Sequence, residues 1–151
     1  MPAPPLPATA TDRAALQRLF QLPLRVYWED TDAGGVVFYA NYLKVFERAR
    51  TEWLRALGFS QQQMLQQDGV MFVVADTAVR YLRAARLDDL LLVSVDVAEA
   101  GRASLKLQQQ ARRDGELLAE GAIRIGCVAG HGTHAGFRPC RIPAAILEKI
   151  R

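Results

Sequence analysis

Apolar positions follow two different periods along the chain. Between residues 39 and 57 they recur every three to four positions, which predicts an amphipathic helix capped by Gly58. The stripe of this helix has Arg50 as its one polar member, and its apolar members are Tyr39, Tyr42, Leu43, Phe46, Trp53, Leu54 and Leu57. From residue 70 onward the period is two, which predicts strands. Residues 60–69 between them predict a short second helix or a loop.

Strands are predicted over residues 22–30, 70–82, 88–100, 102–113 and 116–129. The first places Leu24, Val26 and Trp28 on one face, and Asp114-Gly115 predicts a type I′ hairpin between the last two. One face of the strand at 102–113 carries Ala103, Leu105, Leu107 and Gln109. The order of one strand, a long helix and four strands predicts an α+β protein, with an antiparallel sheet wrapped around one long central helix.

The length of 151 residues suits a single domain with a substantial core. Residues 1–20 are predicted to be an N-terminal extension that is partly disordered, because the first ten are rich in Pro and Ala. A short helix capped by Thr11 is predicted within it, and residues 21–151 are predicted to form the folded domain. We find no signal-peptide pattern and no apolar run long enough to span a bilayer, so a cytoplasmic protein is expected.

Composition narrows the classes of partner. The net charge is +3, and no run of Lys and Arg with interleaved aromatic residues is present, so no nucleic-acid partner is expected. The mild basic excess suits phosphate groups on a small ligand. Cys127 and Cys140 are too few for a disulfide framework in a chain of this length, which agrees with a reducing compartment.

The segment EDTDAGGVVFYANYLKVFERARTEW, residues 29–53, carries the candidate chemistry. Asp30 and Asp32 precede Gly34 and Gly35, and the long helix follows directly. A helix N-terminus presents unpaired N–H groups, and glycines let a ligand approach the backbone closely. A carboxylate beside such amides can hydrolyse an activated acyl group. The residues alone equally allow the acids to cap a turn and the glycines only to bend the chain.

Other candidate chemistries have less support. A metal and nucleotide-sugar site at the two acids would need a parallel βαβ unit, which the pattern lacks. His131 and His134 near Cys140 suit a surface loop better than a metal site. Glu47 and Glu52 lie on the helix beyond the two acids and are expected to be solvated or structural. With no convincing set of ligands in the sequence, neither a metal nor a cofactor is predicted.

Two stretches, RVYWEDTDAGGVVFYANYLKVFERARTEWL and YLRAARLDDLLLV, resemble the hot-dog-fold acyl-CoA thioesterases. Within them the chain is most similar to the YbgC-like branch of the 4-hydroxybenzoyl-CoA thioesterase family, which is associated with the Tol–Pal system. The resemblance runs from about residue 22 to the C-terminus. It implies a hot-dog fold, acyl-CoA or acyl-carrier protein as substrate, no cofactor, and a homodimer or homotetramer with active sites at the dimer interface.

The resemblance also implies roles for individual residues. Asp32 matches the catalytic carboxylate of the family, and Tyr39 matches the residue whose backbone N–H polarises the thioester carbonyl. Gly35 and Arg102 are the implied substrate-binding residues, Arg102 for the CoA phosphates, with Arg138 and Arg141 as weaker candidates of that kind. An ordinary exposed turn arginine is an equally good interpretation of Arg102.

Asp30 matches no catalytic position, which leaves it a role in the turn. Most YbgC-like sequences have Tyr-His where this chain has Phe38-Tyr39, although the hydroxybenzoyl-CoA branch also places Tyr at the second position. The sequence is therefore compatible with two functions. One is a thioesterase with Asp32 as nucleophile or general base, and the other is a non-hydrolytic module that binds acyl-CoA or acyl-carrier protein.

Overall fold

The structure, a computed structural model, describes residues 19–130 and 136–150. Its elements, in chain order, are β1 (Phe20–Arg25), the 3₁₀ helix η1 (Trp28–Asp30), α2 (Asn41–Ala56), α3 (Gln61–Asp68), β2 (Val70–Tyr81), β3 (Leu90–Ala100), β4 (Ser104–Arg113), β5 (Glu116–Ala129), β6 (Arg138–Pro139) and α4 (Ala144–Ile150). The helix predicted in the N-terminal extension lies outside the described residues, and β1 begins at Phe20, the last residue of that extension.

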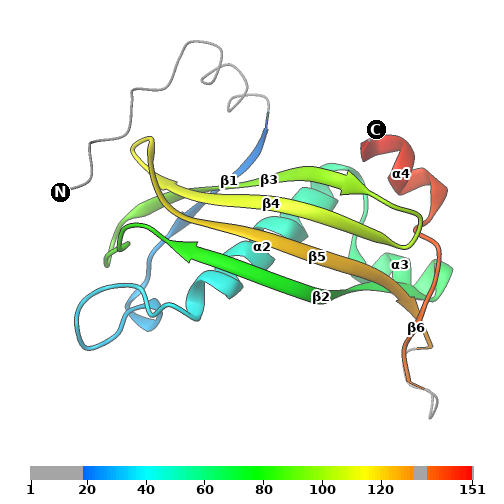
Figure 1. Cartoon of the computed structure of the whole chain (residues 1–151), viewed down its shortest axis with the longest axis horizontal. Coiled ribbons are helices and arrows are strands. Elements are labelled where there is room, and N and C mark those ends of the chain that lie inside the picture. Colours follow the sequence, from blue (N-terminus) through cyan, green and yellow to red (C-terminus); the bar gives the residue numbers. More distant parts are fainter. Residues whose placement is uncertain (1–18, 131–135, 151) are drawn as a thin grey trace.

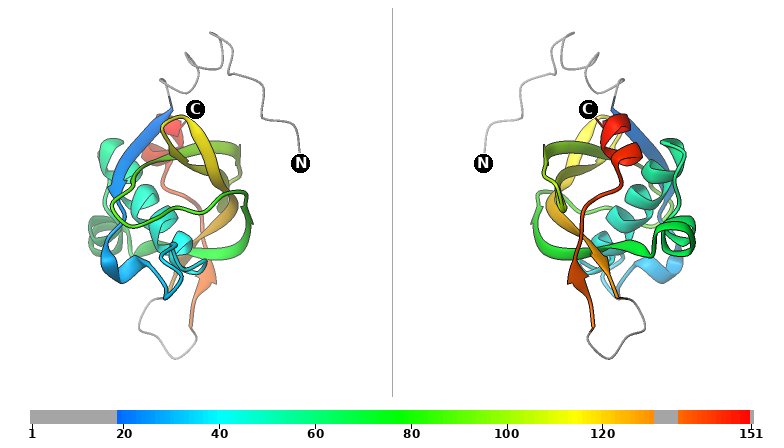
Figure 2. Two further views of the ribbon diagram at one scale, coloured as in Figure 1. Left: turned by 90° about the vertical axis from the view of Figure 1, so that its left-hand side faces the viewer. Right: turned by 90° about the vertical axis from the view of Figure 1, so that its right-hand side faces the viewer.

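The strands form one antiparallel sheet in the order β1-β3-β4-β5-β2, and β6 pairs with the end of β5. The sheet curves around α2, which lies along its concave face (Figures 1 and 2). The predicted arrangement of an antiparallel sheet around one long helix is therefore confirmed. None of the helices in the described part of the chain is long and apolar enough to cross a membrane.

Alternation along the central strands produces the core. Leu105, Leu107 and Gln109 of β4 are fully buried, as the period of two predicts. Asp114 and Gly115 have φ values of 50° and 81°, which the type I′ hairpin requires and which glycine adopts without strain. The hairpin sets the pairing of β4 with β5 and so aligns their buried faces.

A polar contact joins the helix to the sheet inside this core. The Gln109 side chain donates from Nε2 to the Phe46 carbonyl at 3.0 Å and accepts at Oε1 from Arg50 at 3.0 Å. Burial lowers the pKa of Arg50 below its ordinary value. The polar member of the predicted stripe therefore faces the sheet and is paired there, which satisfies two polar side chains in an apolar core.

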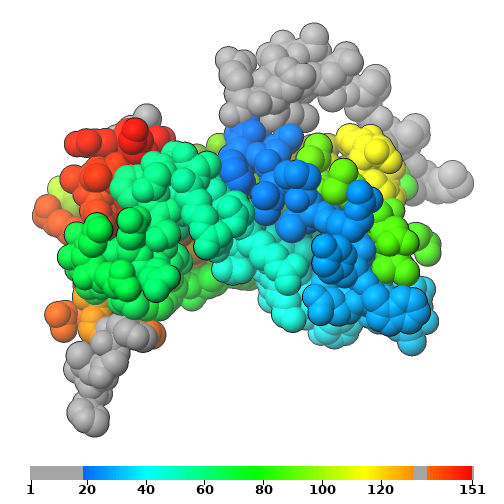
Figure 3. Space-filling model, turned by 180° about the vertical axis from the view of Figure 1, so that it is seen from behind, coloured from blue at the N-terminus to red at the C-terminus, as the bar shows by residue number. Residues whose placement is uncertain are grey.

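Two details of the predicted pattern are wrong. Trp28 does not extend the first strand: it begins η1, and 81% of its surface is exposed, because the chain leaves β3 after Arg25 and turns. The helix also begins later and buries a narrower stripe than predicted, since Tyr39 precedes α2 and is 63% exposed, and Leu43 is 45% exposed. Seen from behind, part of α2 (cyan) is uncovered between β1 (blue) and α3 (blue-green) (Figure 3). The sheet covers only one side of the helix.

Candidate active site

A tight hairpin precedes α2 and carries the candidate acid. Thr31 pairs with Val37, and the Asp32 N–H donates to the Val36 carbonyl at 2.9 Å. The Gly35 N–H donates back to the Asp32 carbonyl at 3.0 Å. Gly35 has a φ of +77°, a left-handed conformation that costs a side-chain-bearing residue free energy. These contacts fix Asp32 at the tip of the hairpin.

The Asp32 carboxylate is exposed and uses one of its oxygens within the turn. Its Oδ1 accepts from the Gly34 N–H at 2.8 Å, and a Cβ at position 34 would lie 3.2 Å from that same oxygen. No described residue donates to the other oxygen, Oδ2. Asp32 thus shapes the turn, as the alternative interpretation holds, and still presents one free carboxylate oxygen to solvent.

Asp30 has a different environment, because it is only 8% exposed. Its Oδ2 accepts from the Tyr27 N–H at 2.8 Å, and its carbonyl accepts from the Phe38 N–H and from Asn41 Nδ2, both at 2.9 Å. Asp30 therefore ties η1 and the hairpin to the first residue of α2. These contacts support the structural role predicted for it.

The start of α2 presents an unused backbone donor. No described residue accepts a hydrogen bond from the Tyr39 N–H. The Tyr39 carbonyl is held instead, because the Tyr81 hydroxyl donates to it at 3.1 Å and the two rings pack edge to face at 6.1 Å. The N–H at this position is thus available, and the residue that carries it is fixed from the side of β2.

The segment between β2 and β3, residues 82–89, packs against the hairpin and is hydrogen-bonded to it. The Val37 N–H donates to the Ala85 carbonyl at 2.8 Å, and the Ala85 N–H donates to the Tyr42 hydroxyl at 3.2 Å. Burial raises the pKa of Tyr42 above its ordinary 10.0, so this phenol stays neutral near pH 7. One residue of this segment, Ala85, therefore contacts both the hairpin and the first turn of α2.

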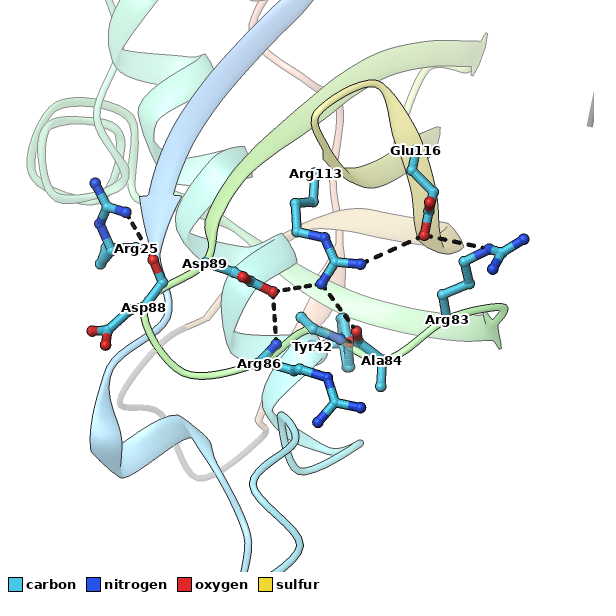
Figure 4. Close-up of polar contacts among 10 residues, drawn as sticks. Arg25, Tyr42, Arg83, Ala84, Arg86, Asp88, Asp89, Arg113 and Glu116 are labelled. Carbon is cyan, nitrogen blue, oxygen red and sulfur yellow. Dashed lines mark hydrogen bonds and ion pairs between the residues drawn. The ribbon is translucent and has the colours of Figure 1, made fainter. Parts of the chain in front are cut away.

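An ion pair holds that segment in place (Figure 4). Asp89 Oδ2 accepts from Arg113 Nη1 at 2.6 Å and from the Arg86 N–H at 2.8 Å. Arg113 also donates to the Ala84 carbonyl at 3.4 Å. Partial burial favours the neutral acid, but the hydrogen bonds and charges of Arg113 and Arg86 outweigh it and hold the pKa of Asp89 below its ordinary 3.8.

Asp89→Asn is expected to lower stability in a pH-dependent way. A carboxyl whose pKa is lowered by folding stabilises the protein above its unfolded pKa, and this contribution disappears as the pH falls through the folded pKa. The variant should lose about 1 kcal/mol of unfolding free energy at pH 7, because solvent reaches both partners. Urea unfolding from pH 7 to pH 2 should show a smaller acid-induced loss in Asp89→Asn than in the wild type. Equal losses in both proteins would contradict the ion-pair role.

Arg102 does not lie with the other predicted site residues. It occupies the β3–β4 turn, where its carbonyl accepts from the Ile142 N–H at 2.8 Å, at the opposite end of the sheet from Asp32 (Figure 1). Glu47 and Glu52 lie along α2 and contact Thr51 and Arg55. His131 and His134 lie outside the residues that the structure describes. Within the described residues, no group of three His, Cys, Asp or Glu side chains is placed to hold a metal ion.

The sequence interpretation missed the residues that support the site from a distance. Tyr81, Ala85, Asp89 and Arg113 all lie more than 40 positions after Asp32, and no local period connects them to it. Asn41 could have been found, because an Asn at the start of a predicted helix commonly makes a hydrogen bond to nearby backbone.

Comparisons with known proteins identify the family and the fold of the chain. The family model described as the thioesterase-like superfamily matches residues 26–150. An acyl-CoA thioesterase YbgC of Haemophilus influenzae is 48% identical over 72% of this chain and 80% of its own length. An acyl-CoA thioester hydrolase YbgC of Escherichia coli is 44% identical over 88% of this chain and 96% of its own length.

A solved structure shows the same fold. The probable thioesterase from Bartonella henselae superposes with a TM-score of 0.77 at 30% identity, over 83% of this chain and 99% of the other. The α+β hot-dog fold predicted from the resemblance is therefore confirmed. The family model covers most of the chain, and two YbgC proteins are 44% and 48% identical to it. The chain therefore belongs to the YbgC acyl-CoA thioesterases of the thioesterase-like superfamily.

Proposed function

We propose that this protein hydrolyses the thioester bond of acyl-CoA to a free acid and a thiol. The observation that carries the proposal is that the segment leading into α2 holds both a carboxylate oxygen of Asp32 and the backbone N–H of Tyr39, neither of which is hydrogen-bonded to any described residue. Thioester hydrolysis needs a nucleophile or base and a donor for the developing oxyanion. The names of the YbgC relatives point to the same reaction class.

In this proposal Asp32 acts in one of two ways. As a general base, it takes a proton from water while the water oxygen attacks the thioester carbon. As a nucleophile, its free oxygen attacks that carbon, expels the CoA thiolate and leaves a mixed anhydride that water then hydrolyses. In both routes the Tyr39 N–H donates to the carbonyl oxygen as negative charge develops on it, and the departing thiolate takes a proton from solvent.

Gly35 has a supporting role in the same proposal. Its left-handed backbone closes the hairpin without a side chain, so the acyl group can approach the main chain between Asp32 and Tyr39. Acyl-CoA is the proposed substrate, and acyl-carrier protein is the second carrier to be compared with it. The cytoplasmic location and the Tol–Pal association stay predictions.

The position of Arg102 leads us to propose a homodimer. Among the described residues β2 pairs only with β5, so its other edge is unpaired there, and Val74 on this strand is 51% exposed. If two copies join their β2 edges about a two-fold axis, the strands run antiparallel. The turn with Arg102 of the partner subunit then lies at the end of the sheet where Asp32 lies, and its guanidinium can contact CoA phosphates.

The oligomer is expected to be stable at micromolar concentration. Light scattering should give a mass at least twice the 16.7 kDa of one chain, and a homotetramer, as the family resemblance implies, would give four times this value. A mass near 16.7 kDa at that concentration would contradict the dimer and leave Arg102 without a role in this site.

A panel of short, long and aromatic acyl-CoAs tests the proposed reaction. Release of free thiol should be saturable in substrate and proportional to enzyme for at least one class of acyl group. The competing function, a module that binds acyl-CoA without hydrolysing it, predicts binding of the same panel with no thiol release. The acyl preference measured in this way identifies the substrate class.

A further inference from the structure

The two cysteines lie side by side at the end of the sheet opposite the Asp32 hairpin. Cys127, near the end of β5, is fully buried in the core, and Cys140, directly after β6, is partly buried against the same core. Both are free thiols, and their Sγ atoms are 3.4 Å apart. Nothing in the proposed hydrolysis uses either of them.

The backbone already positions this pair for a covalent bond. Val128 is opposite Pro139 in the antiparallel pairing of β5 with β6, and the Cys140 N–H donates to the Cys127 carbonyl at 2.9 Å. The Cys127 N–H donates to the Ala103 carbonyl, so the two cysteines share a single backbone hydrogen bond, and their Sγ atoms 3.4 Å apart show that the side chains face each other. Disulfides need Cα atoms within about 4.4–6.8 Å, a range that neighbouring antiparallel strands reach, so small adjustments of side chain and backbone can join the two sulfurs.

We propose that Cys127 and Cys140 form a reversible thiol–disulfide site, oxidised by low-molecular-weight disulfides of the glutathione disulfide class. The Cys140 thiolate attacks one sulfur of the oxidant, forms a mixed disulfide and releases one thiolate. The Cys127 thiol then loses its proton to solvent, attacks the Cys140 sulfur and releases the second thiolate. Overall, two protein thiols are oxidised to one disulfide and one oxidant is reduced to two thiols.

The order of these steps follows from the environments of the two thiols. Cys140 is the partly exposed thiol and is the one that a dissolved oxidant reaches. Burial, together with the neighbouring Cys140, raises the pKa of the Cys127 thiol to about 12, which leaves very little thiolate at neutral pH. Cys127 therefore acts second, once the sulfur of Cys140 is activated at 3.4 Å from it.

Oxidation would fasten the segment after β6 to the sheet. The Ile142 N–H donates to the Arg102 carbonyl at 2.8 Å, and the Cys127 N–H donates to the Ala103 carbonyl at 2.7 Å. The cysteine pair therefore adjoins the two segments that hold the β3–β4 turn. A bond between the sulfurs restricts the separation of those segments and should protect the turn, whether or not the chain hydrolyses thioesters.

The test uses the native full chain with glutathione disulfide, Cys127→Ala as the intermediate trap and Cys140→Ala as the control. The wild type should lose two hydrogens by intact mass, and its tryptic peptide 125–141 should resist alkylation after denaturation until a reductant is added. Cys127→Ala should stop with one glutathione on Cys140. Cys140→Ala should stay unmodified, because Cys127 is buried.

Amide hydrogen exchange of residues 101–104 should slow at least several-fold in the oxidised wild type and stay unchanged in Cys140→Ala. The proposal is overturned if the wild type keeps two alkylatable thiols, or a stable glutathione adduct, under conditions that modify Cys127→Ala. It is also overturned as a fastening device if the disulfide forms and exchange at the turn does not change.

Discussion

Asp32→Asn is expected to lower the turnover of acyl-CoA by ~10²–10⁴-fold, the contribution attributed to a positioned acid or base. The substitution keeps the shape of the side chain, and an Asn oxygen can still accept from the Gly34 N–H, as Asp32 Oδ1 does at 2.8 Å. What it removes is the negative charge and the basicity of the free oxygen. Steady-state thiol release under saturating substrate measures the loss.

Two neighbouring substitutions serve as matched controls. Asp30→Asn should retain most of the turnover, because an amide oxygen can still accept from the Tyr27 N–H. Tyr39→Phe should also retain most of it, since the proposed donor is the backbone N–H, which this change preserves. A large loss in Tyr39→Phe, with Asp32→Asn still active, would move the chemistry from the carboxylate to the phenol.

Phe46→Ala is expected to lower the unfolding free energy by about 3–5 kcal/mol. Phe46 lies in the middle of α2 with none of its surface exposed, and a Cβ placed at Gly121 would lie 3.1 Å from its ring. The ring therefore fills the space between the helix and β5, and its truncation leaves a cavity there. Urea unfolding followed by circular dichroism measures the loss.

Lys44→Ala, on the exposed side of the same helix, is the control for Phe46→Ala. It keeps the helix propensity high and should change the unfolding free energy by no more than about 0.5 kcal/mol. Similar losses in the two variants would show that the packing of α2 against the sheet does not dominate the stability of this fold.

The sheet could be predicted because its side chains repeat over short distances. Alternation placed Leu105, Leu107 and Gln109 on one face, and all three are buried. Asp114-Gly115 set the hairpin that aligns β4 with β5. The width of the buried stripe on α2 could not be predicted in this way, because the extent to which the sheet covers the helix depends on its curvature.

The candidate site likewise contains residues from one local motif and residues from distant parts of the chain. Asp32 and Gly35 share one hairpin, so a short motif was sufficient to propose them together, although the choice of Asp32 over Asp30 came from the family resemblance. The support beneath them comes from residues 81–89 and from Arg113, which only the folding of the sheet brings to the start of α2. The separation of Arg102 from Asp32 within one chain is likewise a property of the strand order.

The most direct test of the catalytic role of Asp32 measures binding and hydrolysis on the same sample of Asp32→Asn. With the best acyl-CoA of the panel, calorimetry should give a Kd within a few-fold of the substrate affinity of the wild type, measured by stopped-flow before turnover. Thiol release from that sample should fall by at least ~10²-fold. Release at a rate near that of the wild type would contradict the account, because Asp32 would then only shape the turn.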